Sequence, residues 1–195
     1  MADVAAVVLA AGKASRWRAS GGTEPTKLIA VWKGAPMVRC VALAALASRA
    51  RPVVVVLGHE AAAVRKALDE LPATFVENRD YAQGLSTSLR AGLAALPARC
   101  AGAVILLGDM PEVGAQVVDA LIAAFAARPD ALAVVPRGAE GLGNPVLLAR
   151  GLFAQASTLR GDKGARGLVE SAGARRVEVE WAGAEIALDI DERGA

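Results

Sequence analysis

Short apolar runs alternate with longer amphipathic stretches over the first 136 residues of the chain, and this alternation strongly limits the possible folds. Such runs, ending at or near glycine, are typical of strands that are buried on both faces. The predicted strands span 4–9, 53–57, 74–77, 104–107 and 132–136, and the predicted helices span 37–48, 60–71, 86–96 and 113–128. A strand–helix repeat of this kind predicts a Rossmann-like α/β sandwich, with helices on both faces of a mostly parallel sheet.

The alternation weakens after residue 136. Three further short strands are predicted over 145–148, 177–181 and 186–190, with short helices over 151–158 and 165–172. We expect these late strands to be antiparallel and to cap the sheet. The chain contains no linker, repeat or low-complexity stretch, so residues 1–195 are expected to form a single domain.

Composition excludes several classes of function. No apolar run approaches the roughly 18–20 residues of a membrane span, and no basic segment precedes the first run, which argues against a secretory signal. A net charge of +2 with three Phe, three Trp and one Tyr leaves no basic, aromatic surface for nucleic acid. Cys40 and Cys100 are widely spaced in apolar stretches, as expected of reduced core thiols in a cytoplasmic protein. His59 is the only histidine, and no Cys/His cluster suits zinc.

Small residues directly follow the first predicted strand. Ala10, Ala11 and Gly12 let the main chain approach a ligand closely, although an ordinary tight turn has the same composition. The dinucleotide fingerprint G-x-G-x-x-G is absent. A glycine-containing loop then carries Arg16, Arg18 and Lys27; it could close over a triphosphate or remain a solvated surface loop.

Carboxylates follow the most apolar predicted strand and lie near the end of the chain. Asp109 comes directly after Gly108, and strand alternation would put Asp189 and Asp191 on one face of the last strand. Mg²⁺ is commonly held by one or two carboxylates together with substrate phosphates. The alternative for Asp109 is a turn or helix-capping residue.

Hydroxyl side chains open the predicted helix near residue 86. Gly84, Leu85, Ser86 and Ser88 fit a plain helix N-terminus, and they also fit an anion site at that end of the helix. The segments 143–145 and 161–166 are turns by composition alone.

Taken together, these segments resemble one family of nucleotidyltransferases, and the similarity covers nearly the whole chain. The motifs occur in a fixed order: Leu9-Ala10-Ala11-Gly12-x-x-Ser15-Arg16, Lys27-Leu28, Gly84-Leu85-Ser86-x-Ser88-Leu89, Leu107-Gly108-Asp109-Met110-Pro111, Gly143-Asn144-Pro145-Val146, Gly161-Asp162-x-Gly164-Ala165-Arg166 and Leu188-Asp189-Ile190-Asp191. The family comprises nucleotidyltransferases of molybdenum-cofactor synthesis, and the resemblance is closest to the molybdenum-cofactor cytidylyltransferases.

The resemblance implies a Mg²⁺-dependent (or Mn²⁺-dependent) transfer of CMP from CTP to molybdopterin-bound molybdenum, with release of pyrophosphate. It assigns residues 1–136 to the nucleotide and residues 137–195 to the acceptor and a second metal ligand. A molybdoenzyme or its chaperone would receive the product. The implied sites are the following: nucleotide, Leu9, Ala10, Ala11, Gly12, Ser15, Arg16, Lys27, Gly58, Gly108 and Asp109; catalysis, Arg16, Lys27 and Asp109; acceptor, Gly84, Leu85, Ser86, Ser88, Asn144 and Pro145; metal, Asp109, Asp189 and Asp191.

Two departures from the family pattern keep alternatives open. Lys27 lies eleven residues after Arg16 instead of about five, so Lys13 is a second candidate for its role, and Glu192-Arg193 replaces the family's Thr-Pro turn. The alternatives are a non-catalytic carrier that binds nucleotide or pterin, a transferase that uses GTP or another acceptor, and an oxidoreductase on the same scaffold. The missing dinucleotide fingerprint argues against the last.

Overall fold

The apolar runs form the central strands of one mixed sheet in the computed structural model, which describes residues 3–13, 17 and 23–187. Neighbouring strands follow the order β10-β7-β9-β6-β1-β4-β5, and β8 pairs with β7. The strands are β1 Asp3–Ala10, β4 Val53–Leu57, β5 Thr74–Glu77, β6 Cys100–Leu107, β7 Ala133–Gly138, β8 Gly141–Leu142, β9 Val146–Ala149 and β10 Arg176–Glu180. A separate hairpin consists of β2 Val31–Trp32 and β3 Ala35–Pro36.

Most of this sheet is parallel, as the strand–helix alternation predicts. β1 pairs in parallel with β4 on one side and with β6 on the other, and β4 pairs in parallel with β5. β9 is antiparallel to both β6 and β7, which confirms the expected reversal for one late strand. β10 is parallel to β7, so the prediction that it would be antiparallel is wrong.

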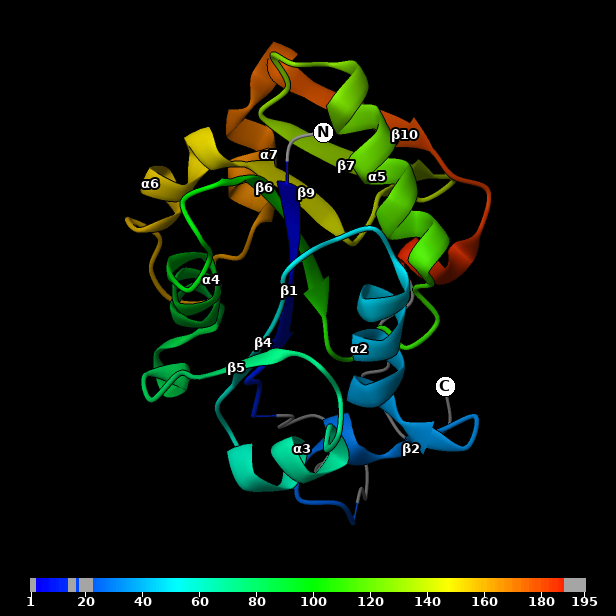
Figure 1. Cartoon of the computed structure of the whole chain (residues 1–195), viewed down its shortest axis with the longest axis vertical. Helices are drawn as coiled ribbons and strands as arrows, with labels where there is room; N and C mark the ends of the chain where they lie inside the picture. Colours follow the sequence, from blue (N-terminus) through cyan, green and yellow to red (C-terminus); the bar gives the residue numbers. More distant parts are fainter. Residues whose placement is uncertain (1–2, 14–16, 18–22, 188–195) are drawn as a thin grey trace.

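Helices cover both faces of the sheet (Figure 1). The helices are α2 Met37–Ala47, α3 Ala61–Ala67, α4 Leu85–Ala94, α5 Ala115–Ala127, α6 Phe153–Ala156 and α7 Arg166–Ser171. Single 3₁₀ turns are η1 Lys27–Ile29, η2 Tyr81–Gln83, η3 Arg150–Leu152, η4 Gly173–Arg175 and η5 Ala184–Ile186. The structure therefore has the predicted three-layer Rossmann-like architecture.

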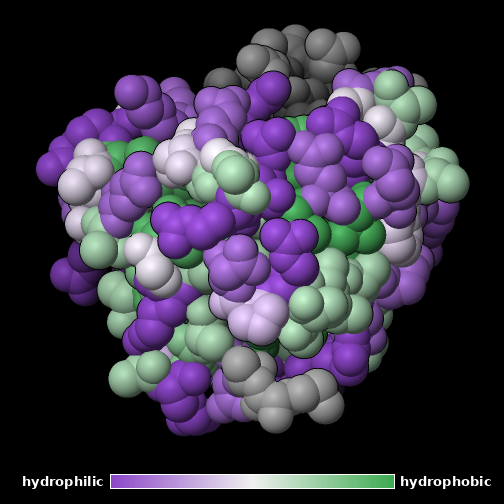
Figure 2. Space-filling model, turned by 90° about the horizontal axis from the view of Figure 1, so that it is seen from above, coloured by the Kyte–Doolittle hydropathy of each residue, from purple (hydrophilic) through white to green (hydrophobic). Residues whose placement is uncertain are grey.

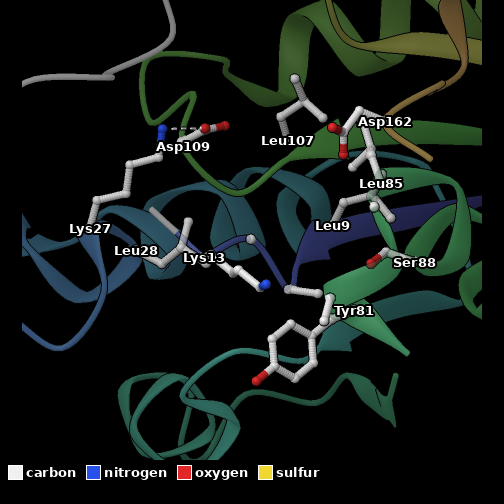
Figure 3. A pocket seen from close by; sticks show the side chains of 14 residues that line it. Leu9, Lys13, Lys27, Leu28, Tyr81, Leu85, Ser88, Leu107, Asp109 and Asp162 are labelled. Atoms are coloured by element: carbon white, nitrogen blue, oxygen red, sulfur yellow. Dashed lines mark ion pairs between the residues drawn. The ribbon is translucent and has the colours of Figure 1, made fainter. Parts of the chain in front are cut away.

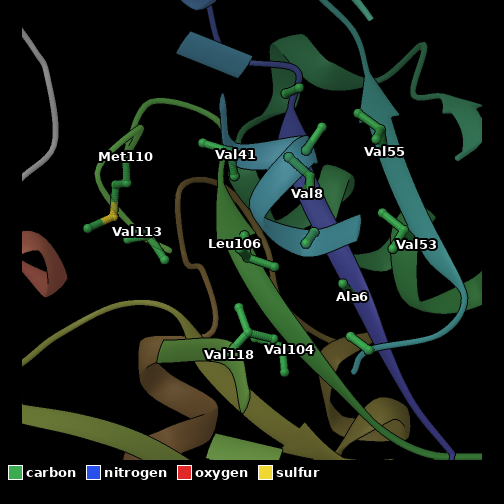
Figure 4. Close-up of a cluster of buried hydrophobic side chains, with 14 of the residues drawn as sticks. Ala6, Val8, Val41, Val53, Val55, Val104, Leu106, Met110, Val113 and Val118 are labelled. Carbon is green, nitrogen blue, oxygen red and sulfur yellow. The ribbon is translucent and has the colours of Figure 1, made fainter. Parts of the chain in front are cut away.

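β1 is apolar at every position after Asp3 because both of its faces are buried. Val4, Ala6 and Val8 pack into the core cluster beneath α2 and α5, beside Val41 and Leu106 (Figure 4). The residues between them belong to a second cluster on the α4 side of the sheet. A strand that is buried on both faces needs two apolar sets, and this requirement places β1 at the centre of the fold.

Two local predictions fail where tertiary packing decides the conformation. The expected helix 60–71 ends at Ala67, and Glu70 has a φ of 65°. The expected strand 186–190 begins instead with the end of η5, because Ile186 is buried against the sheet; residues 188–190 lie outside the described part.

Surface and cysteine features agree with the composition. In the described residues, no helix has the length and apolar character needed to span a bilayer. Hydrophilic residues are spread among hydrophobic ones on the face seen from above (Figure 2). Cys40 and Cys100 are both free thiols, and burial raises the pKa of each, which keeps them protonated.

Candidate active site

A cavity of about 470 Å³ lies beyond the carboxyl ends of β1 and β6 (Figure 3). Ligands of open α/β sheets bind at this end of the strands. The residues that line it are Leu9, Ala11, Gly12, Lys13, Lys27, Leu28, Tyr81, Ala82, Gly84, Leu85, Ser88, Leu107, Asp109 and Asp162. Eight of them were sequence candidates for nucleotide or acceptor binding, so segments far apart in the chain meet at one cavity.

Backbone hydrogen bonds hold the turn after β1 from both sides. The amide of His59 donates to the carbonyl of Ala11 at 3.2 Å, and the amide of Gly108 donates to the carbonyl of Leu9 at 3.0 Å. Ala10 is fully buried, whereas Gly12 is exposed and lines the cavity. The turn therefore presents its main chain around Gly12 to a ligand, while the Ala10 methyl group faces the interior.

Gly58, a predicted nucleotide-binding residue, has a structural reason to be glycine. A Cβ atom there would lie 2.6 Å from the Cβ of Ala11 and 2.7 Å from the Cβ of Tyr81. Gly58 does not line the cavity; it lets the turn after β1 and the ring of Tyr81 pack closely. The structure therefore gives Gly58 a packing role beside the cavity.

Lys27 and Asp109 form an ion pair across the cavity wall, with Nζ 2.7 Å from Oδ2. Their side chains are 11% and 22% exposed, respectively. Lys27 opens η1, and the buried Thr26 hydroxyl at the N-cap accepts a 3.5 Å hydrogen bond from the amide of Leu28. The longer loop before Lys27 therefore does not keep this lysine from the predicted site.

Ser88 and Ser86 occupy different environments at the start of α4. The Ser88 hydroxyl lines the cavity and accepts a 3.0 Å hydrogen bond from the buried side-chain amide of Asn78. Ser86 is fully buried, and its hydroxyl has no hydrogen-bond partner. The Ser86 side chain is therefore turned into the protein and, unlike that of Ser88, does not line the cavity.

A second cavity, of about 290 Å³, adjoins the first. The two share Leu9, Leu85, Leu107 and Asp162. Asn144 also lines the second cavity, but Pro145, which follows a cis peptide bond, is buried and lies away from it. Of this predicted pair, only Asn144 lines the second cavity.

Sequence reasoning missed roles for two cavity residues, Asp162 and Tyr81. Asp162 is exposed and lines both cavities. It belongs to the motif over residues 161–166, to which the resemblance assigns no role. Gly84 has a φ of +107° and packs against Gly161, which brings Asp162 beside α4. Tyr81 is half-buried, with its ring centre 5.9 Å from that of His59.

The described residues supply part of a site that would suit a hard cation. Asp109 and Asp162 present carboxylate oxygens to the same cavity, and oxygen ligands together with substrate phosphates are what Mg²⁺ and Mn²⁺ prefer. Within 3–13, 17 and 23–187, no group of three or more His, Cys, Asp or Glu side chains could hold a metal alone. The predicted nucleotide-binding residues Ser15 and Arg16 and the predicted metal ligands Asp189 and Asp191 lie outside the described residues.

The sequence that forms this site matches a known protein family. The model of the MobA-like NTP transferase domain matches residues 6–178, which include every cavity-lining residue. The chain belongs to this family. The strands, the turn after β1 and the Lys27–Asp109 pair are therefore parts of a nucleotidyltransferase domain.

Solved structures of similar proteins cover almost the whole chain. Rv0371c from Mycobacterium tuberculosis is 28% identical, with a TM-score of 0.83 over 98% of this chain and 95% of that one. A nucleotidyl transferase from Methanothermobacter thermautotroptrophicus is 26% identical, with a TM-score of 0.81 over 97% and 92%. Rv0371c has also been solved in complex with manganese.

The bifunctional protein GlmU of Kineococcus radiotolerans is a curated relative that is 33% identical over 133 residues. The match covers 67% of this chain and 26% of GlmU. The chain thus spans about a quarter to a third of the length of the curated relatives it matches.

Proposed function

We propose that this protein transfers a nucleotidyl group from a metal-bound nucleoside triphosphate to a phosphorylated acceptor, with CTP as donor and molybdopterin-bound molybdenum as acceptor. The observation that carries the proposal is the pair of adjoining cavities, with Lys27 and Asp109 on the wall of the first. Two cavities that share a wall suit a reaction that joins two small molecules. Residues 1–136 would serve the nucleotide, and residues 137–195 the acceptor.

The reaction balances without a strong base. A phosphate oxygen of the acceptor forms a bond to the α-phosphorus, the bond from that phosphorus to the bridging oxygen breaks, and pyrophosphate leaves. The attacking phosphate is already ionised, so the protein must bring two anions together in line. A chain whose one histidine does not line the first cavity suits such chemistry.

The first cavity would hold the nucleotide. The main chain of the turn over 9–12 would hold the base and ribose, and Lys27 with Arg16 would neutralise phosphate charge. Lys13, which also lines the cavity, adds a further cation beside Tyr81 (Figure 3). The alanine pair at positions 10 and 11, in place of a pair of glycines, resembles the cytidylyl branch of the family more than the guanylyl branch, which supports CTP as the donor.

Asp109 would hold the divalent cation together with Asp189 and Asp191. When bound, the metal acts as a Lewis acid on the α-phosphate and as a template for both substrates. The structure of Rv0371c in complex with manganese supports the dependence of this protein on a divalent metal. Lys27 would then leave Asp109 and pair with a phosphate of the nucleotide.

The second cavity would hold the acceptor. Its floor is apolar, with Ile105, Val135 and Val146, and its rim carries Asn144 and Asp162. This combination suits a flat heterocycle that has polar groups at its edge. Gly84, Leu85 and Ser88 would lie between the acceptor and the nucleotide. The product would pass to a molybdoenzyme or its chaperone in the cytoplasm, in accord with two free thiols.

A second candidate is the same reaction with another acceptor or with GTP. The similarity to GlmU over two thirds of the chain favours it, because these relatives need not share the molybdopterin acceptor. A carrier that binds CTP without turnover is the non-enzymatic alternative.

Two measurements test the proposal. Melting temperatures with each of the four nucleoside triphosphates, with and without Mg²⁺, should rise most with CTP and Mg²⁺, because a ligand that binds only the folded state stabilises it. Pyrophosphate release should then require CTP and reduced molybdenum cofactor together. Release with GTP or with a sugar phosphate would select the second candidate, binding without release would select the carrier, and no stabilisation by any nucleotide would overturn the proposal.

A further inference from the structure

The β2–β3 hairpin directly follows the segment that carries Lys27. Its two-residue turn has φ values of 47° at Lys33 and 91° at Gly34, the left-handed pair typical of a tight hairpin. This turn places Trp32 and Lys33 beside the loop that follows Asp109.

Glu112 receives both of these side chains. The indole Nε1–H of Trp32 donates to Oε1 of Glu112, and Nζ of Lys33 lies 2.7 Å from Oε1 and 2.9 Å from Oε2. Glu112 is 26% exposed, and Trp32 packs against a small cluster that contains Met37. The carboxylate is therefore held from two directions.

The same two chain segments are thus joined twice. Lys27 pairs with Asp109, and six residues later Lys33, with Trp32, pairs with Glu112, which is three residues beyond Asp109. The Lys27–Asp109 contact lies at the cavity, whereas Trp32, Lys33 and Glu112 do not line it. Nucleotide and metal compete for Lys27 and Asp109, but nothing in the proposed reaction competes for Glu112.

We propose that Glu112 is a positioning residue, and that Trp32, Lys33 and Glu112 form a clamp that keeps Lys27 and Asp109 in register after their ion pair opens. This inference rests on the proposed function. When Lys27 turns to a phosphate and Asp109 to a metal, their direct link is lost, and the clamp still holds the two segments together. Small displacements of the reacting groups lower the rate of the chemical step strongly, so the loss of this restraint should lower kcat.

A surface ion pair with no effect on the site is the simplest competing explanation, because Lys33 is 71% exposed. The Trp32 hydrogen bond separates the two explanations. The indole N–H of Trp32 donates to the partly buried carboxylate of Glu112, and a hydrogen bond with an ionised partner is roughly twice as strong as one between neutral groups.

The test is a double-mutant cycle on the whole chain with Lys33→Met, Glu112→Gln and both together. We expect kcat to fall about tenfold or more for Glu112→Gln, while the KM for the nucleotide changes less than about threefold. The double variant should lose little beyond Glu112→Gln, because each substitution breaks the same contact. Lys33→Arg keeps the positive charge, so this variant should retain most of the wild-type kcat. Trp32→Phe removes the indole N–H, so this single substitution should by itself lower kcat.

Binding of Mn²⁺, followed by electron paramagnetic resonance, gives a readout that does not need turnover. Glu112→Gln should weaken Mn²⁺ binding several-fold, although Glu112 lies outside the cavity. Arg99→Met is the matched control, because Arg99 pairs with Asp3 at 3.0 Å where β1 begins, at the other end of the strand from the cavity. This control should change neither quantity.

The outcomes distinguish the clamp from the proposed function. A wild-type chain that releases pyrophosphate, with Glu112→Gln equal to it in kcat and in Mn²⁺ binding, would overturn the clamp alone. If the wild type shows no transfer, the same double-mutant cycle can be measured on Mn²⁺ affinity. Effects of Lys33→Met and Glu112→Gln on Mn²⁺ affinity that are additive or absent would contradict the clamp. Melting temperatures that fall while kcat and Mn²⁺ binding stay constant would mean a purely structural pair.

Discussion

Lys27 and Asp109 lie far apart in the sequence, and yet Nζ of the lysine is 2.7 Å from Oδ2 of the aspartate. η1 and the turn after β6 bring them together at the wall of a cavity. In the proposed reaction, the ammonium of Lys27 binds a phosphate and the carboxylate of Asp109 binds the metal, and the ion pair places both groups at the cavity. Each of the two charges would, in that reaction, stay neutralised by the other until the substrate binds.

Asp109→Asn should abolish transfer without unfolding the protein. We expect the rate to fall by about 10²–10³-fold or more, since a group that holds charge at the reacting centre is lost. The amide has the same shape, so the melting temperature should stay within about 4 °C of the wild type. Asp130→Asn, which removes an exposed carboxylate paired with Arg128, is the control and should leave the rate unchanged. Full activity of Asp109→Asn would remove Asp109 from the mechanism.

Gly58→Ala should destabilise the protein by about 1–3 kcal/mol, because the added Cβ overlaps Ala11 and Tyr81. Nucleotide affinity should fall as well, since the turn after β1 must shift. Gly167→Ala in α7 is the matched control: its Cβ would meet nothing within 4 Å, so it should be neutral or slightly stabilising. Chemical denaturation measures both variants, and equal stability of the two would contradict the packing argument.

Ser86→Ala and Ser88→Ala should have opposite effects. Ser86 buries a hydroxyl without a partner, so its removal should leave stability unchanged or raise it by about 1 kcal/mol. Ser88→Ala removes a cavity hydroxyl and one of the two hydroxyl groups to which the Asn78 amide donates, and we expect weaker substrate binding together with a small loss of stability. Substrate titration combined with thermal unfolding separates the two. A loss of substrate affinity in Ser86→Ala alone would contradict this placement.

The stability of the fold should depend on pH through Glu112. The ammonium of Lys33 lowers the pKa of Glu112 below its usual value of 4.5, and the indole of Trp32 lowers it further. A folded-state pKa below the unfolded value adds stability that is present above about pH 4.5 and is lost as pH falls through the folded pKa. Melting temperatures between pH 6 and pH 3.5 should therefore fall less steeply for Glu112→Gln than for the wild type.

Glu178 extends this pH dependence at the other side of the sheet. A hydrogen bond from Arg137 lowers the pKa of Glu178, and a hydrogen bond from Arg176 acts in the same direction. In the double variant with Glu178→Gln and Glu112→Gln, the melting temperature should fall still less steeply between pH 6 and pH 3.5 than in Glu112→Gln alone. Identical slopes for the wild type and both variants would show that neither carboxylate contributes.

The central fold could be predicted from the sequence because its signals are local. Each apolar run that became β1, β4 or β6 carries its own period, and a glycine near its end marks the start of a turn. Motif order led to the nucleotidyltransferases and grouped Lys27 with Asp109, which the structure places 2.7 Å apart. The helix boundaries and the direction of β10 were less predictable, because they depend on which neighbour each segment finds.

The sequence by itself determined the layers, the strands that carry ligand-facing turns and the residue types available there. Only the tertiary structure decided that Lys27 reaches Asp109 despite a longer loop, that Ser86 turns inward while Ser88 lines the cavity, and that Glu112 joins the hairpin to the loop beyond β6. The physical reason is range. Backbone periodicity is set within a few neighbouring residues, whereas ion pairs, buried hydroxyls and cavities arise between segments that become neighbours only after the chain has folded.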